Sequence, residues 1–173
     1  MASGFGGAKC ENYTAVGRVV GFDVGQRRIG VAVSDASGTL ARPLGALQVH
    51  GVGAAAVDAA VEQIARLAAE DDNISLLVVG LPRRLDGTAN DMTAPVEQFA
   101  RALEERTRLP VALQDERLSS VEAESRLARR EKDWRARKTQ LDAAAAAVIL
   151  QDFLDSQHAS RHDDEDATRP RQH

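Results

Sequence analysis

The stretch that decides the fold is Val19–Asp35, with the sequence VVGFDVGQRRIGVAVSD. Its two apolar, β-branched runs, Val19–Phe22 and Ile29–Val33, are typical of β-strands, and Gly25 between them permits a turn. The stretch therefore predicts an antiparallel hairpin. Asp23 lies inside the first strand, where a buried carboxylate needs a hydrogen bond, a cationic partner or a metal ion. The alternative is that Asp23 only caps the Gly25 turn.

Strands and helices alternate along the rest of the chain, which predicts an α/β domain with right-handed parallel crossovers. The helix before the last one opens with a capping box, Ser-Ser-Val-Glu. The final helix is rich in alanine, which allows close approach to a sheet. The expected elements are an edge strand within Thr39–Val49, a helix through Val57–Ala68 ending near Asp71, a buried strand Ile74–Gly80, a helix with Thr93 as N-cap, a strand Val111–Asp115, a helix from Ser119 and a helix from Thr139 to about Leu154.

The apolar spacing also predicts which helix faces are buried. The inner residues expected in the helix after Thr93 are Val96, Phe99, Ala100 and Leu103, and those expected in the final helix are Leu141, Ala145, Val148, Ile149 and Phe153.

Length and composition predict one domain. The 173 residues are 43% hydrophobic with a net charge of −4, which argues against a wholesale nucleic-acid coat. No apolar run has the length of a membrane span and the N-terminus has no apolar export segment, so we expect a cytoplasmic protein with no membrane partner. The expected division is a disordered leader over residues 1–17, a domain over 18–155 and a disordered tail over 156–173.

Two further carboxylates lie beside apolar elements. Glu116 follows the strand Val111–Asp115, at the carboxyl end where open α/β sheets build their sites. Asp142 lies in the first turns of the alanine-rich helix, on the same side as Ile149. If both converge on Asp23, divalent cations with oxygen ligands would relieve their repulsion, which predicts Mg²⁺ or Mn²⁺. The alternatives are a surface ion-pair triplet for Glu116 and a helix-dipole acid for Asp142.

Five ordered motifs resemble the YqgF/RuvX family of pre-16S rRNA nucleases and Holliday-junction resolvase-like proteins. The resemblance runs from about Arg18 to Asp155 and implies a ribonuclease H-like fold, a mixed five-stranded sheet flanked by helices. It also implies that the family's acidic triad corresponds to Asp23, Glu116 and Asp142. One departure is EKDWRARK, which replaces a Gly-containing, Lys-rich linker. The motifs are GFDVGQRRIGVAVSD, VVGLPRRLDGT, M-T-x-x-V-x-x-F-A, DERLSSVEA and LDAAAAAVILQDFLD.

The resemblance implies a metal-dependent endonuclease, a hydrolase that processes the 5′ end of pre-16S rRNA in ribosome biogenesis. One alternative is a Holliday-junction resolvase acting on branched DNA in recombination and repair, which would need a symmetric homodimer. A second is a nucleic-acid-binding module without catalysis. A third is an actin-like or sugar-kinase-like nucleotide-binding protein, because D-x-G-x-x-x-x-G resembles its phosphate loop, although the chain is too short for the second domain of that class.

Basic residues indicate where nucleic acid would bind. Arg28 and Arg84 are predicted to touch substrate near the cut, the alternative being surface ion pairs. The segment Arg126–Lys138 has seven basic residues among thirteen, and Arg135, Arg137 and Lys138 in it are predicted to contact the phosphate backbone. The alternative for this segment is a solvated helix end.

Overall fold

A computed structural model describes residues 17–71, 73–116 and 134–167. It confirms the α/β class with a mixed five-stranded sheet, in the strand order β3-β2-β1-β4-β5. The elements are β1 (Arg18–Val24), β2 (Arg28–Ser34), β3 (Ala41–Gln48), α1 (Ala54–Asp71), β4 (Ile74–Leu81), α2 (Thr93–Thr107), β5 (Val111–Asp115) and α4 (Trp134–Ala167).

The hairpin that opens the chain confirms the first prediction. β1 and β2 pair antiparallel, and the Gly25 N–H donates to the Arg28 carbonyl across the turn. β1 pairs parallel with β4, and β4 pairs parallel with β5, as the alternation of strands and helices predicted. The third strand lies at the sheet edge, where Pro43 is tolerated.

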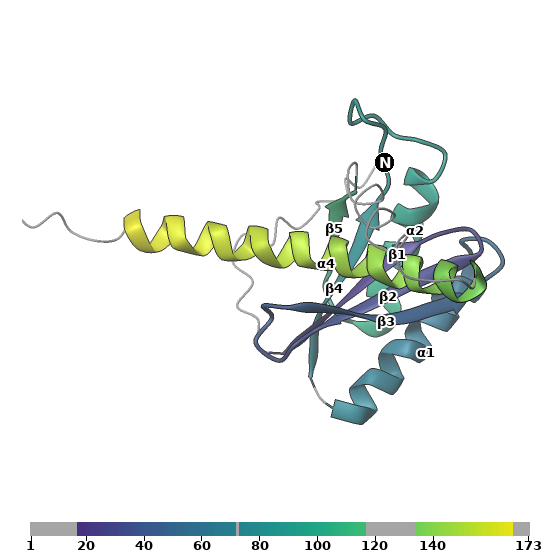
Figure 1. Cartoon of the computed structure of the whole chain (residues 1–173), viewed down its shortest axis with the longest axis horizontal. Coiled ribbons are helices and arrows are strands. Elements are labelled where there is room, and N and C mark those ends of the chain that lie inside the picture. The colour runs from purple at the N-terminus through teal and green to yellow at the C-terminus, as the bar shows by residue number, and fades with distance from the viewer. Residues whose placement is uncertain (1–16, 72, 117–133, 168–173) are drawn as a thin grey trace, which may run out of the picture.

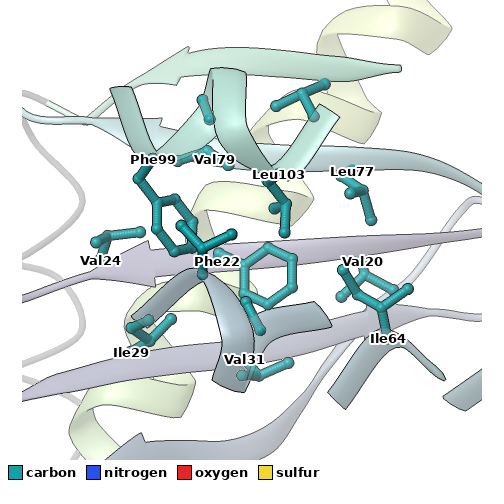
Figure 2. Packing of buried hydrophobic residues seen from close by; sticks show 14 of the residues in the cluster. Val20, Phe22, Val24, Ile29, Val31, Ile64, Leu77, Val79, Phe99 and Leu103 are labelled. Atoms are coloured by element: carbon teal, nitrogen blue, oxygen red, sulfur yellow. The ribbon is translucent and has the colours of Figure 1, made fainter. Parts of the chain in front are cut away.

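Helices cover both faces of the sheet. α4 crosses one face and extends past the sheet, whereas α1 and α2 lie against the other face (Figure 1). Phe22 and Phe99 meet edge to face on the α1 and α2 side, with ring centroids 6.5 Å apart (Figure 2). Because β1 alternates, Val20, Phe22 and Val24 belong to this larger core and the residues between them face α4. Asp23 therefore points to the α4 side.

The residues that bury α2 are those predicted, but its start is not. Val96, Phe99, Ala100 and Leu103 are buried, whereas Met92 occupies the N-cap position and Thr93 is the first helical residue. The Thr93 hydroxyl donates instead to the Pro82 carbonyl. Asn90 replaces the predicted cap, since its side-chain oxygen accepts from the Met92 and Thr93 N–H groups.

The final helix differs more. α4 starts at Trp134 and continues to Ala167, so a disordered tail from residue 156 is not what the structure has through Ala167. No glycine or proline follows Leu154 before Pro170, and Ser156 and Ser160 hydroxyls bond to backbone carbonyls one turn earlier. The rest of the division into leader, domain and tail stays a prediction. Among residues 138–160 of α4, whose side chains the structure describes, the buried ones are Ala143, Ala146, Ile149, Leu150, Phe153 and Leu154. Only Ile149 and Phe153 of these were predicted, because a run of alanines has no apolar period.

The predicted helix from Ser119 lies outside the described residues, as does the leader through residue 16. None of the helices in the described ranges combines the length and apolarity that a membrane crossing requires.

Candidate functional site

Asp23 lies between two glycines at one end of the sheet. Gly30 of β2 is its antiparallel partner. On the other side, the parallel pairing of β1 with β4 runs up to Phe22 and Val79, the residues that precede Asp23 and Gly80. Glycines inside strands often mark a close approach of other groups. The two positions therefore open space on either side of the Asp23 carboxylate, on the face that α4 covers.

The space over Gly30 admits the backbone of α4 at Asp142. A Cβ atom at Gly30 would lie 1.9 Å from the Asp142 carbonyl oxygen, a contact that no side chain could make. Asp142 also lines up with Ala146 and Ile149 at spacings of four and seven residues, and both of these are buried against the sheet. The predicted sheet-facing position of Asp142 is thus where the structure has this residue.

The space over Gly80 admits the carboxylate of Glu116. A Cβ atom at Gly80 would lie 2.5 Å from Glu116 Oε2 and 2.7 Å from Ile149 Cδ1. Glu116 follows β5, and its N–H donates to the Leu81 carbonyl at the end of β4. Its side chain is half-buried, whereas that of neighbouring Asp115 is exposed. Glu116 is therefore turned toward the sheet rather than placed in a surface triplet.

Asp23 and Glu116 share a hydrogen bond between their carboxyl groups, and burial makes ionising both of them costly. Burial is the main reason that the pKa of Glu116 rises to about 8, with the negative charge of Asp23 as the next cause. Burial first, and then the negative charge of Asp142, raise the pKa of Asp23 to about 6, although the hydrogen bond with Glu116 acts in the opposite direction. A hydrogen-bonded carboxyl pair titrates as a unit, so the two groups together keep one proton near neutral pH. The turn-capping alternative for Asp23 is not what its contacts show.

Asp142 has a cationic partner in the described structure. The Arg28 Nε donates to Asp142 Oδ2 at 2.5 Å, and the two side chains are only 19% and 29% exposed. Arg28, predicted to touch substrate, is thus an ion-pair partner within the site in this state. Its substrate contact stays a prediction.

The donor chemistry of the site fits a hard divalent cation, since the carboxyl groups of Glu116, after β5, and Asp142, on α4, lie near that of Asp23 on β1. The three carboxyl groups do not surround one common metal position, since among the described residues no three His, Cys, Asp or Glu side chains are arranged to hold a metal ion. Asp23, Glu116 and Asp142 are the residues that could hold one once Asp142 turns from Arg28 to the other two.

The remaining predicted residues are either exposed or have side chains outside the described ones. Arg84 is exposed in the loop after β4, where its N–H donates to the Thr88 carbonyl and shapes a tight turn. Lys138 is exposed near the start of α4. The side chains of Arg135 and Arg137 lie outside the described ones, and so does the segment from Arg126 to residue 133.

Sequence reasoning did not single out the glycines on either side of Asp23. The signal was present, because Gly30 and Gly80 each interrupt an otherwise apolar strand. What the sequence lacked was the sheet register that puts both of them next to Asp23.

A family model described as "RuvX: Holliday junction resolvase" matches residues 17–156. The chain belongs to this family. A protein of Thiobacillus denitrificans named "Putative pre-16S rRNA nuclease" is 43% identical over 140 residues, which cover 81% of this chain and 92% of that protein. A protein of Xanthomonas axonopodis pv. citri with the same name is 45% identical over 141 residues, covering 80% and 87%. The structure titled "T. thermophilus RuvC in complex with Holliday junction substrate" has a TM-score of 0.49 and 15% identity, covering 83% of this chain and 97% of that one.

Membership of the RuvX family confirms the resemblance seen in the five motifs. The five-stranded mixed sheet with helices on both faces confirms the expected sheet architecture, and the ribonuclease H-like class stays what the resemblance implies. By the names of its members the family is one of nucleases, which confirms the expected enzyme class and favours it over the actin-like alternative. The likeness to RuvC is too slight to carry an argument of its own.

Proposed function

We propose that this RuvX-family chain is a divalent-metal-dependent endonuclease that processes the 5′ end of pre-16S rRNA. The observation that carries the proposal is the gathering of the Glu116 and Asp142 carboxyl groups around Asp23 at one end of the sheet. The names of the relatives support the substrate. The corresponding location is the cytoplasm, where ribosomes are made.

The three carboxylates would divide the work of holding Mg²⁺ or Mn²⁺. Asp23, Glu116 and Asp142 are the residues that would hold the ions. When bound, such ions supply an activated water and charge stabilisation for an in-line displacement at phosphorus. Loading the site requires the shared proton of Asp23 and Glu116 to leave. Because burial raises the pKa of both groups, we expect metal binding to strengthen as pH rises toward 8.

Substrate positioning would fall to basic residues around this cluster. Arg84 is exposed in the loop after β4, at the same end of the sheet as Glu116, which follows the parallel strand β5. The basic residues Arg135, Arg137 and Lys138 open α4, the helix that carries Asp142. Contacts from these residues to phosphates would place the scissile bond without reading sequence.

A second candidate is resolution of four-way DNA junctions, which the family description favours. It uses the same phosphodiester chemistry but needs two sites facing two strands, and therefore a homodimer.

One preparation of the protein tested on both substrates separates the candidates. We expect cleavage of a precursor rRNA at its 5′ end in Mg²⁺ or Mn²⁺, with much slower cleavage of a four-way junction. Asp23→Asn, purified in parallel, controls for contaminating nuclease. Rapid, symmetrical junction cleavage by a dimer, with the precursor left intact, would replace the first candidate with the second.

A further inference from the structure

The ion pair between Arg28 and Asp142 joins two elements that are far apart in the sequence. The residues are separated by 114 positions, on β2 and on α4, and the bond from Arg28 Nε to Asp142 Oδ2 is 2.5 Å long. Both side chains are mostly buried, unlike those of the Arg66 and Glu62 pair on α1, which are about two-thirds exposed. Partial burial reduces solvent screening, so this pair is the stronger of the two.

The ion pair also lies on the sheet face that carries the candidate site. Arg28 and Gly30 are two residues apart on β2 and therefore share the face that α4 covers. The Asp142 backbone rests over Gly30, which is the strand partner of Asp23. The guanidinium is thus the positive charge next to a carboxylate that faces Asp23.

We propose that Arg28 holds the place of a metal ion on Asp142, so that the guanidinium and a divalent cation compete for this carboxylate. The inference rests on the metal site of the proposed function. Arg28 is then a positioning residue. Without metal, its guanidinium holds the Asp142 side chain in place and neutralises the negative charge of that carboxylate. When the metal ion binds, Arg28 releases Asp142. The released guanidinium carries its charge at the rim of the site, where a substrate phosphate would arrive, which reconciles its ion pair with its predicted substrate contact.

The test measures Mn²⁺ binding directly, by electron paramagnetic resonance of free Mn²⁺, and needs no cleavage. We expect Arg28→Gln to lower the Kd for Mn²⁺ about fivefold, because a partly exposed ion pair contributes about 1 kcal/mol. Arg28→Lys keeps the charge and should stay close to wild type. Arg66→Gln, which breaks the exposed pair on α1, is the matched control and should change nothing.

A double-mutant cycle isolates the pair. In an Asp142→Asn background, where no carboxylate remains to compete for, Arg28→Gln should change the Kd for Mn²⁺ by less than twofold. Equal or weaker Mn²⁺ binding by Arg28→Gln, an unreduced effect in the Asp142→Asn background, or no binding by wild type would overturn the inference. Failure of the proposed function looks different: Mn²⁺ competition as described, with no RNA or junction cleaved, would remove the nuclease assignment and leave the role of Arg28 intact.

Discussion

Replacing Asp23 by Asn should stabilise the metal-free protein, by an amount that grows as the pH rises from the unfolded pKa of 3.8 to above the folded pKa of about 6. In the folded wild type the pKa of Asp23 is raised from 3.8 to about 6, mainly by burial. This difference corresponds to about 3 kcal/mol, at about 1.4 kcal/mol for each pKa unit. Because Asp23 shares its proton with Glu116 and is partly exposed, we expect Asp23→Asn to raise the free energy of unfolding by about 1 to 3 kcal/mol.

The sign follows from proton linkage. A carboxyl group whose pKa is higher in the folded than in the unfolded state contributes stability below pH 3.8, and this is lost as the pH rises through about 6. Asparagine carries no charge to bury and can still donate a hydrogen bond to Glu116. The variant should therefore equal wild type near pH 4 and exceed it by about 1 to 3 kcal/mol near pH 8.

Urea unfolding followed by circular dichroism in EDTA, at several values between pH 4 and pH 8, measures this difference. Asp35→Asn is the control of opposite sign, because hydrogen bonds from Ser37, Thr39 and Leu40 lower the pKa of Asp35. That variant should lose stability at neutral pH and lose less in acid. A gain for Asp23→Asn that is the same at pH 4 and pH 8, or a loss at pH 8, would refute the reasoning.

Three further changes test the geometry around Asp23 and the expected substrate contacts. Gly80→Ala should push the Glu116 carboxylate aside and lower the rate of cleavage at least tenfold in a folded protein, whereas Gly45→Ala, where an added Cβ meets nothing within 4 Å, should leave rate and Tm unchanged. Gly30→Ala should lower the Tm by more than Gly80→Ala or Gly45→Ala does, because the added Cβ would collide with the backbone of α4 rather than with a side chain. An unchanged Tm for Gly30→Ala would contradict the close approach of α4 to β2. Arg84→Ala should raise KM for RNA and leave the metal requirement as it is, and a wild-type KM would remove Arg84 from the substrate surface.

The part of the fold that could be predicted from sequence rests on local apolar patterns. The hairpin at Gly25 and the inner face of α2 both follow from short-range spacing, and both are confirmed. The alanine-rich stretch of α4 has no such period, and only Ile149 and Phe153 among the residues predicted for its inner face are buried. Its extension to Ala167 was missed because the segment beyond Leu154 lacks apolar residues, although it also lacks a helix breaker.

The acids of the candidate site could be named from sequence, but not their partners. Asp23, Glu116 and Asp142 stand out as carboxylates beside apolar elements. The Arg28 ion pair depends on how α4 crosses β2, a long-range contact that no local pattern reports. The role of Gly80 was equally unpredictable, because its missing side chain leaves space for Glu116, which follows another strand.

Cleavage of the preferred substrate by wild type and by Asp23→Asn, Glu116→Gln and Asp142→Asn, each in Mg²⁺, Mn²⁺, Ca²⁺ and EDTA, tests the central claim most directly. If the three carboxylates form one metal-dependent site, wild type cleaves in Mg²⁺ and Mn²⁺, binds without efficient cleavage in Ca²⁺ and is inactive in EDTA. Each folded variant then binds substrate and loses cleavage by at least a hundredfold. Cleavage by wild type in EDTA, or by folded Asp23→Asn free of contaminating nuclease, would contradict the claim.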